Sequence, residues 1–321
     1  MQFSVIIPLY NKAPYVAKAI RSVLAQSFKD YELIVIDDGS KDESADIAQQ
    51  VIEGHTNCRL ICQENAGVSI ARNNGVAVSQ GEYFCFLDAD DWWEPSFLEE
   101  MSRLIEEYPE AGIYGTNYTI VNETKHKTRV ASVGVGVGFE KGYINYCQVY
   151  AKTLIMPLTS ISVAIPRLIF YETGGFPLGI KLGEDFLLWI QIALKHKVAF
   201  LNKPLAYYNQ DVDVTNRGVG RLHYPKEHML WNLTYLAPLE QSNSDFKQLI
   251  DNLRTYGLYP YYLSKDYHDA AVVELKKVDW ERQSKRVRDR YNRPLVIERL
   301  LHSIKKLGSM VKSKSLCVLS K

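Results

Sequence analysis

The first hundred residues alternate between short, continuous apolar runs and longer stretches in which apolar residues recur every three or four positions. Continuous runs are typical of buried strands, and the longer spacing is typical of amphipathic helices. The expected strands are residues 3–10, 31–40, 58–63 and 82–88. The expected helices are residues 13–27, 44–54, 68–81 and 95–109. Strands that alternate with helices indicate an α/β fold, in which helices flank a mostly parallel, Rossmann-like central sheet.

The rest of the chain divides into two parts by its pattern. Residues 111–121 and 197–210 are expected to be strands, and residues 184–196 a helix. From about residue 211 the pattern becomes helical and rich in tyrosine. We therefore predict a sheet-containing domain over residues 1–210 and a mainly helical C-terminal extension with a basic tail over residues 211–321.

The cysteines and the apolar runs restrict the class of protein. The five cysteines are scattered and include no Cys-x-x-Cys pair, which argues against a disulfide framework or a structural zinc site and fits a reducing compartment. The first residues do not resemble a secretory signal, and no apolar run approaches the roughly 20 residues of a membrane helix. We therefore expect a soluble, cytoplasmic protein.

The net charge of +1 hides an uneven distribution. Residues 281–321 carry twelve Lys and Arg against three Asp and Glu, which leaves 26 basic and 34 acidic residues in 1–280. Two interpretations of this basic end remain open. It attaches to the anionic inner surface of a membrane, or it is a solvated helix that packs on the core or on a second subunit of a homodimer. We do not expect nucleic-acid binding, because the body is acidic and contains no recognised module.

Polar and acidic residues directly follow three of the predicted strands. They form the segments PLYN (8–11), DDGS (37–40) and DADD (88–91). In open α/β sheets, ligands bind just beyond the carboxyl ends of the strands. We therefore expect these three segments to converge on one crevice.

The third segment concentrates negative charge. Asp88, Asp90 and Asp91 lie so close in sequence that their charges repel, and they cannot be buried cheaply without a cation or hydrogen-bond donors. One explanation is Mg²⁺ or Mn²⁺, which proteins hold through one or two carboxylates while substrate phosphates complete the shell. The other is capping of the helix that follows, which accounts for one acid but hardly for three.

Other candidate residues have ordinary explanations when each is taken alone. Asp38 lies in an acidic turn, which is a common way to leave a strand, but it could accept a hydrogen bond from a base or ribose. Tyr10 and Asn11 could be surface residues, although a tyrosine at a strand end can stack on a base. Arg72 lies on the polar side of a predicted helix, where a solvated arginine is the default interpretation.

Four segments, taken in order, resemble the family-2 glycosyltransferases, which have the nucleotide-sugar-binding fold called GT-A. The resemblance extends over residues 1 to about 210, and the ordered combination is more specific than any single motif. The segments are 4–44 (SVIIPLYNK to KDES), 65–75 (NAGVSIARNNG), 81–93 (GEYFCFLDADDWW) and 183–194 (GEDFLLWIQIAL).

The resemblance implies which residues surround the donor nucleotide. Pro8, Tyr10 and Asn11 would border the base and the ribose. Asp38 would hydrogen-bond the base, and Arg72 would assist on the same side.

The resemblance also assigns the acidic segment. Asp88 would contact the ribose or the metal, and Asp90 would coordinate Mn²⁺ or Mg²⁺ that bridges the donor diphosphate. Asp91 is a further candidate in the same group. The three carboxylates would then be neutralised by a divalent ion that arrives with the nucleotide sugar.

A second acidic pair, Glu184 and Asp185, opens the predicted helix 184–196. In the family that it resembles, the aspartate of this pair is the proposed general base, which points to Asp185. A positioned carboxylate can take the proton that an acceptor hydroxyl loses as it attacks. Taken alone, the pair could only cap the helix. Trp189, one turn later, would line the sugar pocket or lie in the core.

The resemblance implies an inverting, metal-dependent glycosyltransferase that transfers a hexosyl or N-acetylhexosaminyl group in cell-surface polysaccharide or O-antigen-type synthesis. The expected donor is a UDP-linked sugar, and the expected acceptor is a saccharide or a lipid-linked saccharide. A nucleotidyltransferase would show a Gly-rich, basic loop after the first strand, which PLYNKAP lacks. The alternative from another class is a non-catalytic protein that binds nucleotide sugars or serves as a scaffold.

Overall fold

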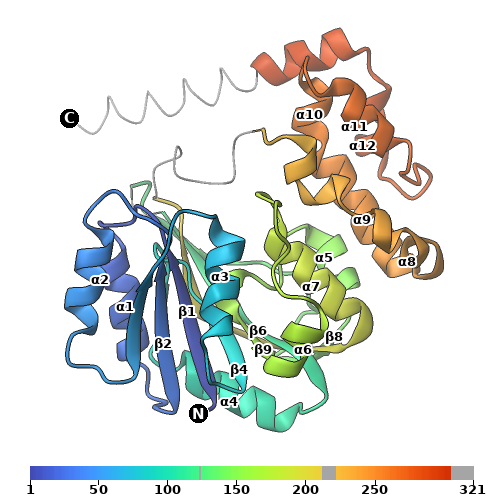
Figure 1. The fold of residues 1–321 in the computed structure, drawn as a ribbon. Helices are drawn as coiled ribbons and strands as arrows, with labels where there is room; N and C mark the ends of the chain where they lie inside the picture. Colours follow the sequence, from blue (N-terminus) through green and yellow to red (C-terminus); the bar gives the residue numbers. More distant parts are fainter. Residues whose placement is uncertain (123, 212–221, 305–321) are drawn as a thin grey trace. The chain divides into compact units, whose positions relative to one another are not determined.

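The computed structural model describes residues 1–122, 124–211 and 222–304. Its contacts divide the chain into two compact units, Met1–Phe246 and Lys247–Lys321. The first unit contains the sheet, and the second is helical (Figure 1).

The sheet of the first unit has the strand order β3-β2-β1-β4-β9-β6-β10-β5, with β7 beside β6 and β8 beside β10. The strands β1 to β4 are parallel neighbours, β9 is antiparallel to both β4 and β6, and β10 is parallel to β6. The sheet is therefore mixed: β1 to β4 pair in parallel, as predicted, whereas five of the nine pairings among the described strands, each involving β5, β7, β8 or β9, are antiparallel. Its strands are β1 (Phe3–Leu9), β2 (Tyr31–Asp37), β3 (Cys58–Cys62), β4 (Tyr83–Phe86), β5 (Trp92–Trp93), β6 (Ala111–Asn122), β7 (Lys127–Val130), β8 (Lys141–Ile144), β9 (Val163–Pro166) and β10 (Lys197–Asn209).

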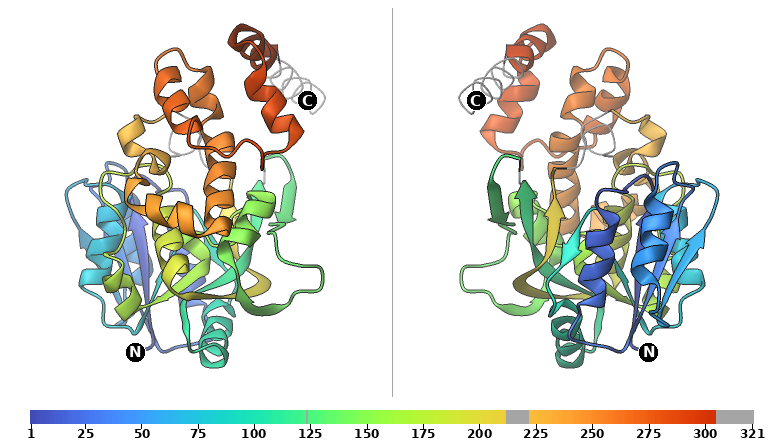
Figure 2. Two further views of the ribbon diagram at one scale, coloured as in Figure 1. Left: turned by 90° about the vertical axis from the view of Figure 1, so that its right-hand side faces the viewer. Right: turned by 90° about the vertical axis from the view of Figure 1, so that its left-hand side faces the viewer.

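Helices flank this sheet, which confirms the predicted α/β fold class. The first two helices lie side by side (Figure 2). The predicted apolar face of the first helix is real, because Val16, Ile20 and Val23 are fully buried. The helices of this part are α1 (Val16–Leu24), α2 (Ser44–Ile52), α3 (Val68–Ala77), α4 (Phe97–Glu107), α5 (Tyr146–Thr153), α6 (Arg167–Glu172) and α7 (Glu184–Lys195).

Residues 222–246 belong to the first unit, so the division between units falls later than the sequence-based boundary at residue 210. The physical reason is backbone pairing between two short segments. The N–H of Lys181 donates to Glu227 O (2.7 Å), and the N–H of Met229 donates to Leu182 O (3.0 Å). Short 3₁₀ turns carry no long periodicity that a sequence could show. The elements here are η3 (Pro225–Glu227), η4 (Met229–Trp231), η5 (Thr234–Leu236) and α8 (Ala237–Ser242).

Gly183 makes this packing possible and provides a test of it. Its φ is +84°, and a Cβ placed there would lie 2.6 Å from Met229 Sδ. We expect Gly183→Ala to lower the free energy of unfolding, by about 1–2 kcal/mol for the left-handed backbone and about 1–3 kcal/mol for the overpacking. Thermal unfolding followed by circular dichroism measures the loss.

Gly179 is the matched control for that substitution. Its φ is +77°, but a Cβ there would meet nothing within 4 Å. Gly179→Ala should therefore carry the backbone cost alone. Equal destabilisation by the two alanines would contradict the packing of Met229 against Gly183.

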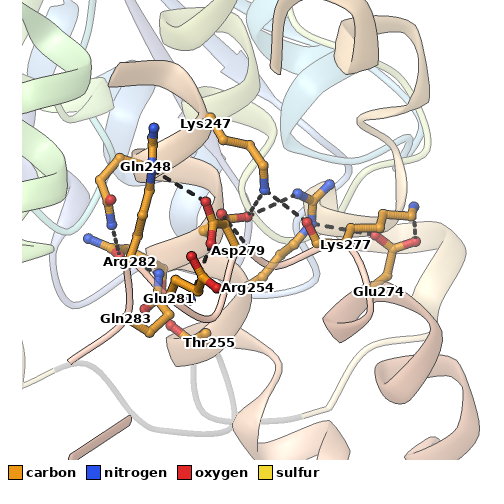
Figure 3. A network of polar contacts seen from close by, with 12 residues as sticks. Lys247, Gln248, Arg254, Thr255, Glu274, Lys277, Asp279, Glu281, Arg282 and Gln283 are labelled. Carbon is orange, nitrogen blue, oxygen red and sulfur yellow. Dashed lines mark hydrogen bonds and ion pairs between the residues drawn. The ribbon is translucent and has the colours of Figure 1, made fainter. Parts of the chain in front are cut away.

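The second unit contains the expected helices, and charged pairs lie in its interior. Arg254 and Asp251 are 2% and 0% exposed, and their side chains approach to 3.6 Å. Lys247 Nζ donates to Asp251 Oδ1 (2.5 Å). Lys277 Nζ donates to Glu274 Oε1 (2.5 Å) (Figure 3). Buried charges are tolerated only when they are paired in this way. The elements are α9 (Ser244–Gly257), α10 (Tyr259–Leu263), α11 (His268–Leu275), α12 (Lys285–Asn292) and helical residues 295–304.

The predicted basic tail is only partly within the structure. Residues 281–304 of it are described, and residues 305–321 lie outside the described residues. In the part of the chain that is described, none of the helices combines the length and the apolar character that a membrane-spanning segment needs.

Candidate active site

The loops after β1, β2 and β4 meet at one edge of the sheet. Leu9 and Asp37, the last residues of β1 and β2, are opposite each other in parallel register. Beyond them, the N–H of Asn11 donates to Ser40 Oγ (3.0 Å) and the N–H of Lys41 to Asn11 Oδ1 (2.7 Å). The structure therefore brings together the segments 8–11 and 37–40, as the strand-end argument predicted.

The three predicted base-side residues of the first loop differ in exposure. Tyr10 is 44% exposed, so its ring is available for stacking. Asn11 has a φ of +50°, an unusual backbone conformation for a residue with a side chain. Pro8 is half-buried on β1 opposite Ile36. Their contacts with a nucleotide stay predictions.

Asp38 is buried and anchors the loop that leads into α3. Its Oδ1 accepts from Gln63 Nε2 and from the N–H of Ala66, and its Oδ2 accepts from the N–H of Gly67, each at 2.8 Å. Only 3% of the residue is exposed. The carboxylate thus has a local structural role that the sequence did not reveal, and its hydrogen bond to a base stays a prediction.

Arg72 joins two acidic segments that are far apart in sequence. Its Nη2 donates to Asp88 Oδ1 (2.7 Å) and its Nη1 to Glu184 Oε1 (3.1 Å). Burial would lower the pKa of the guanidinium, but the charges of Asp88, Glu184 and Asp185 outweigh burial and raise this pKa. The default interpretation of a solvated arginine is therefore wrong, because Arg72 is 3% exposed and doubly paired.

The acidic segment 88–91 is only partly neutralised by the protein. Lys12 Nζ donates to Asp90 Oδ2 (2.6 Å), Ser160 Oγ to Asp88 Oδ2 (3.1 Å), and the N–H of Asn209 to Asp91 Oδ1 (2.7 Å). The sequence missed all three donors. Lys12 could have been suspected from its place beside PLYN, whereas nothing near Ser160 or Asn209 in sequence pointed to this site.

The pKa values of these acids show the surplus of negative charge. Burial is the largest influence on Asp90 and raises its pKa; Lys12 opposes this effect and Asp88 adds to it. Burial, followed by the charges of Asp90 and Asp88, raises the pKa of Asp91 well above its ordinary value. A further cation at this position would relieve the repulsion.

The donor set fits a divalent ion that is held mostly by substrate. Within the described residues, no three His, Cys, Asp or Glu side chains gather as a complete metal site. Asp88 and Asp90 supply carboxylate oxygens, which is the usual protein share for Mg²⁺ or Mn²⁺ beside a nucleotide. Metal dependence and the assignment of Asp88 and Asp90 as ligands stay predictions.

Asp185 lies in the first turn of α7, directly after Glu184. Its Oδ1 accepts the N–H of Phe186 (2.9 Å). Burial raises the pKa of Asp185 to about 7, and the charge of Glu184 adds to this, whereas Arg72 lowers it. A carboxyl group with a pKa near the working pH is well matched to general-base catalysis. The hydrogen bond from the N–H of Phe186 also means that Asp185 can help to stabilise the start of α7, so the helix-capping interpretation stays open.

Trp189 lies in the core, which is one of the two positions that the sequence left open. It is 0% exposed, and its ring meets that of Phe176 edge-on with centroids 5.8 Å apart. Asn73 in turn fixes Phe176, since its amide donates to Phe176 O (2.9 Å) and accepts from the N–H of Phe176 (3.0 Å). This contact ties α3 to the loop before α7, and no local sequence pattern marked Asn73.

The fold is a GT-A architecture. The chain belongs to glycosyltransferase family 2, because residues 4–172 match the family described as "Glycosyl transferase family 2". A relative, Glycosyltransferase GlyA of Streptococcus pneumoniae serotype 4, is 32% identical over 262 residues, which are 78% of this chain and 37% of the relative. An uncharacterized glycosyltransferase of Rickettsia conorii is 26% identical over 79% of this chain and 46% of its own length. The chain thus matches less than half of each of these two proteins.

A solved structure shows the same fold. The crystal structure of S. aureus TarS 1-349 in complex with UDP-GlcNAc has a TM-score of 0.72 to this chain, at 17% sequence identity. The match covers 86% of this chain and 80% of that structure. The likeness confirms the GT-A fold.

Proposed function

We propose that the protein transfers a sugar from a nucleotide-diphosphate sugar to an acceptor hydroxyl, with inversion at the anomeric carbon. The observation that carries the proposal is the pair of contacts from Arg72 to Asp88 and Glu184, at 2.7 and 3.1 Å. Through this one buried cation, the acids after β4 and the first turn of α7 are held in one site. In this proposal, Asp88 contacts the donor and Asp185 acts as the base, and both lie close enough to act on one donor and one acceptor bound together.

The reaction is a single displacement. Asp185 takes the proton of the acceptor hydroxyl as that oxygen forms a bond to the anomeric carbon, and the bond from this carbon to the diphosphate oxygen breaks with its electron pair leaving on the diphosphate. The acceptor attacks opposite the leaving group, so the configuration inverts. Asp88 and Asp90 would hold a divalent ion, which would supply charge stabilisation for the departing diphosphate.

The chain's own residues hold and orient the donor. Tyr10 stacks on the base, with Pro8 and Asn11 at its border, and Asp38 bonds the base edge. UDP is the proposed nucleotide, which is supported by the fold shared with a protein whose structure contains UDP-GlcNAc. Arg72 keeps Asp88 oriented.

The acceptor in this proposal is a saccharide or lipid-linked saccharide of cell-surface polysaccharide synthesis, reached at an anionic membrane surface. Val296, Leu300 and Ile304 recur every four residues along helical residues 295–304, and they are 77%, 60% and 55% exposed. A basic segment beside an exposed apolar helix face suits an anionic interface. Flotation with anionic and neutral vesicles tests the contact; a homodimer that covers this face instead would appear in light scattering.

Donor titration by calorimetry tests the proposed function. UDP-glucose, UDP-galactose, their N-acetylated forms, GDP-mannose and dTDP-rhamnose are each titrated with Mn²⁺ and again with EDTA. We expect one UDP-sugar to bind and to need Mn²⁺. No binding of any donor in either condition would contradict the donor site. Donor binding without sugar transfer to any saccharide acceptor, and therefore without release of UDP, would favour the non-catalytic alternative.

A further inference from the structure

Lys12 occupies the place where a divalent ion is proposed to bind. Its Nζ lies 2.6 Å from Asp90 Oδ2, and the two side chains are only 16% and 18% exposed. Ion pairs that are largely withdrawn from water are screened less than surface pairs. The ammonium therefore is a substantial counter-charge to Asp90.

The backbone of Lys12 is fixed, so only its side chain can change partner. Its N–H donates to Ser44 Oγ (2.7 Å), and its carbonyl accepts the N–H groups of Tyr15 (2.9 Å) and Val16 (3.0 Å) at the start of α1. Asn11 before it is locked by hydrogen bonds to Ser40 and Lys41. Four side-chain bonds of a lysine remain free to swing the ammonium away from Asp90.

An ammonium and a divalent cation that shared one carboxylate would repel each other strongly. Asp88 is not a free partner for a displaced ammonium, because Arg72 and Ser160 already donate to its two oxygens. A metal ion that arrives alone must therefore break the Lys12–Asp90 pair without offering the lysine a new partner. A metal ion that arrives with a diphosphate brings such a partner, because phosphate oxygens accept from lysine.

We propose that Lys12 is a displaceable counter-ion, which keeps Asp90 closed to free metal and moves its ammonium to the donor diphosphate when metal and nucleotide bind together. The inference rests on the proposed function, in which Asp90 is the metal ligand. It makes metal and nucleotide binding mutually dependent, and this coupling must be reciprocal. The enzyme would then hold little metal until a donor is present.

Mn²⁺ binding to the full chain, followed by electron paramagnetic resonance of free Mn²⁺ with and without UDP, tests this proposal. We expect Lys12→Met to bind Mn²⁺ alone about tenfold more tightly than the wild type. The factor by which UDP strengthens Mn²⁺ binding should fall by about the same amount. Calorimetry of UDP with and without Mn²⁺ should show the same reduced factor.

Two further variants keep the test decisive. Lys12→Arg retains the charge beside Asp90 and should behave as the wild type. Lys41→Met removes an exposed lysine of the neighbouring loop and should also leave Mn²⁺ binding unchanged. Equal Mn²⁺ affinity of the wild type and Lys12→Met, with UDP binding intact, overturns the inference alone, as does an equal effect of Lys41→Met. Failure of the wild type to bind UDP under any condition overturns the proposed function and this inference with it.

Discussion

Replacing Asp185 by Asn is expected to lower the rate of sugar transfer by about 100- to 10,000-fold, the usual contribution of a general base. Asn cannot take the acceptor proton, but it is nearly the same size and can keep the hydrogen bond from the N–H of Phe186. Donor binding, measured by calorimetry with Mn²⁺, should stay within about threefold of the wild type because the donor contacts lie on other segments. Single-turnover transfer measures the chemical step.

Asp46 provides the matched control, because it is an exposed acid in the first turn of another helix, α2. Asp46→Asn removes a helix-start charge without touching the site, and it should leave transfer unchanged. If Asp185→Asn changed transfer no more than Asp46→Asn, Asp185 would only support the start of α7.

The raised pKa of Asp185 also predicts how the transfer rate and the stability should change with pH. A base must be ionised to act, so kcat/KM should rise about tenfold per pH unit below the pKa of about 7 and level off above it. Stability should change in the opposite direction, since a carboxyl whose pKa is higher in the folded state than its ordinary 3.8 destabilises the fold as it ionises. Stability is thus lost as pH rises from about 4 through about 7.

Asp185→Asn separates these two effects. At pH 8 the variant should unfold at a higher temperature than the wild type, because the half-buried charge is gone, and this difference should vanish at pH 4. A helix-capping role predicts the reverse sign. Thermal unfolding at the two pH values decides between them.

Replacing Arg72 by Met is expected to destabilise the protein by about 3–5 kcal/mol, the cost of leaving a buried ion pair without one partner. Both Asp88 and Glu184 lose their cation in this variant. The negative charge around Asp185 then has no nearby compensation from Arg72, so the pKa of Asp185 should rise further and the transfer rate at neutral pH should fall. Chemical denaturation measures the first effect and the pH profile the second.

Arg59→Met is the comparison for that variant. Arg59 also pairs with a glutamate, since its Nη2 lies 2.8 Å from Glu32 Oε2, but its side chain is 43% exposed. Glu32 is itself buried, but it also accepts from Ser4 Oγ and from the N–H of Gln80. Arg59→Met should therefore destabilise the protein less than Arg72→Met. Similar destabilisation by the two substitutions, or an unchanged pH profile in Arg72→Met, would contradict the linking role assigned to Arg72.

The sequence predicted the parts of the fold that depend on local pattern. Apolar runs and helical spacing located β1 to β4 and the helices between them, and parallel topology placed the acids of residues 37–40 and 88–91 at one edge. The antiparallel strand β9 was not foreseen. It has only four residues, and its place between β4 and β6 depends on a return of the chain from far along the sequence.

The sequence predicted the acidic residues of the site but not the residues that donate hydrogen bonds to them. Asp88, Asp90 and Asp185 stand out because carboxylates after a strand or at a helix start are conspicuous in a sequence. Ser160, which donates to Asp88, lies 72 residues away from it, and Glu184 lies 112 residues from Arg72. Such contacts depend on tertiary packing, which no local pattern encodes.

The position of Arg72 between two acids also bears on how this protein could change during evolution. Loss of the arginine leaves two carboxylates without their cation, whereas loss of one carboxylate leaves the arginine paired with the other. Substitutions at residues 72, 88 and 184 should therefore be accepted in pairs rather than singly, and they should appear as a covarying trio in alignments of close relatives. A lineage that lost catalysis would no longer be under this constraint. Residues 72, 88 and 184 would then be substituted independently of one another before the fold changed.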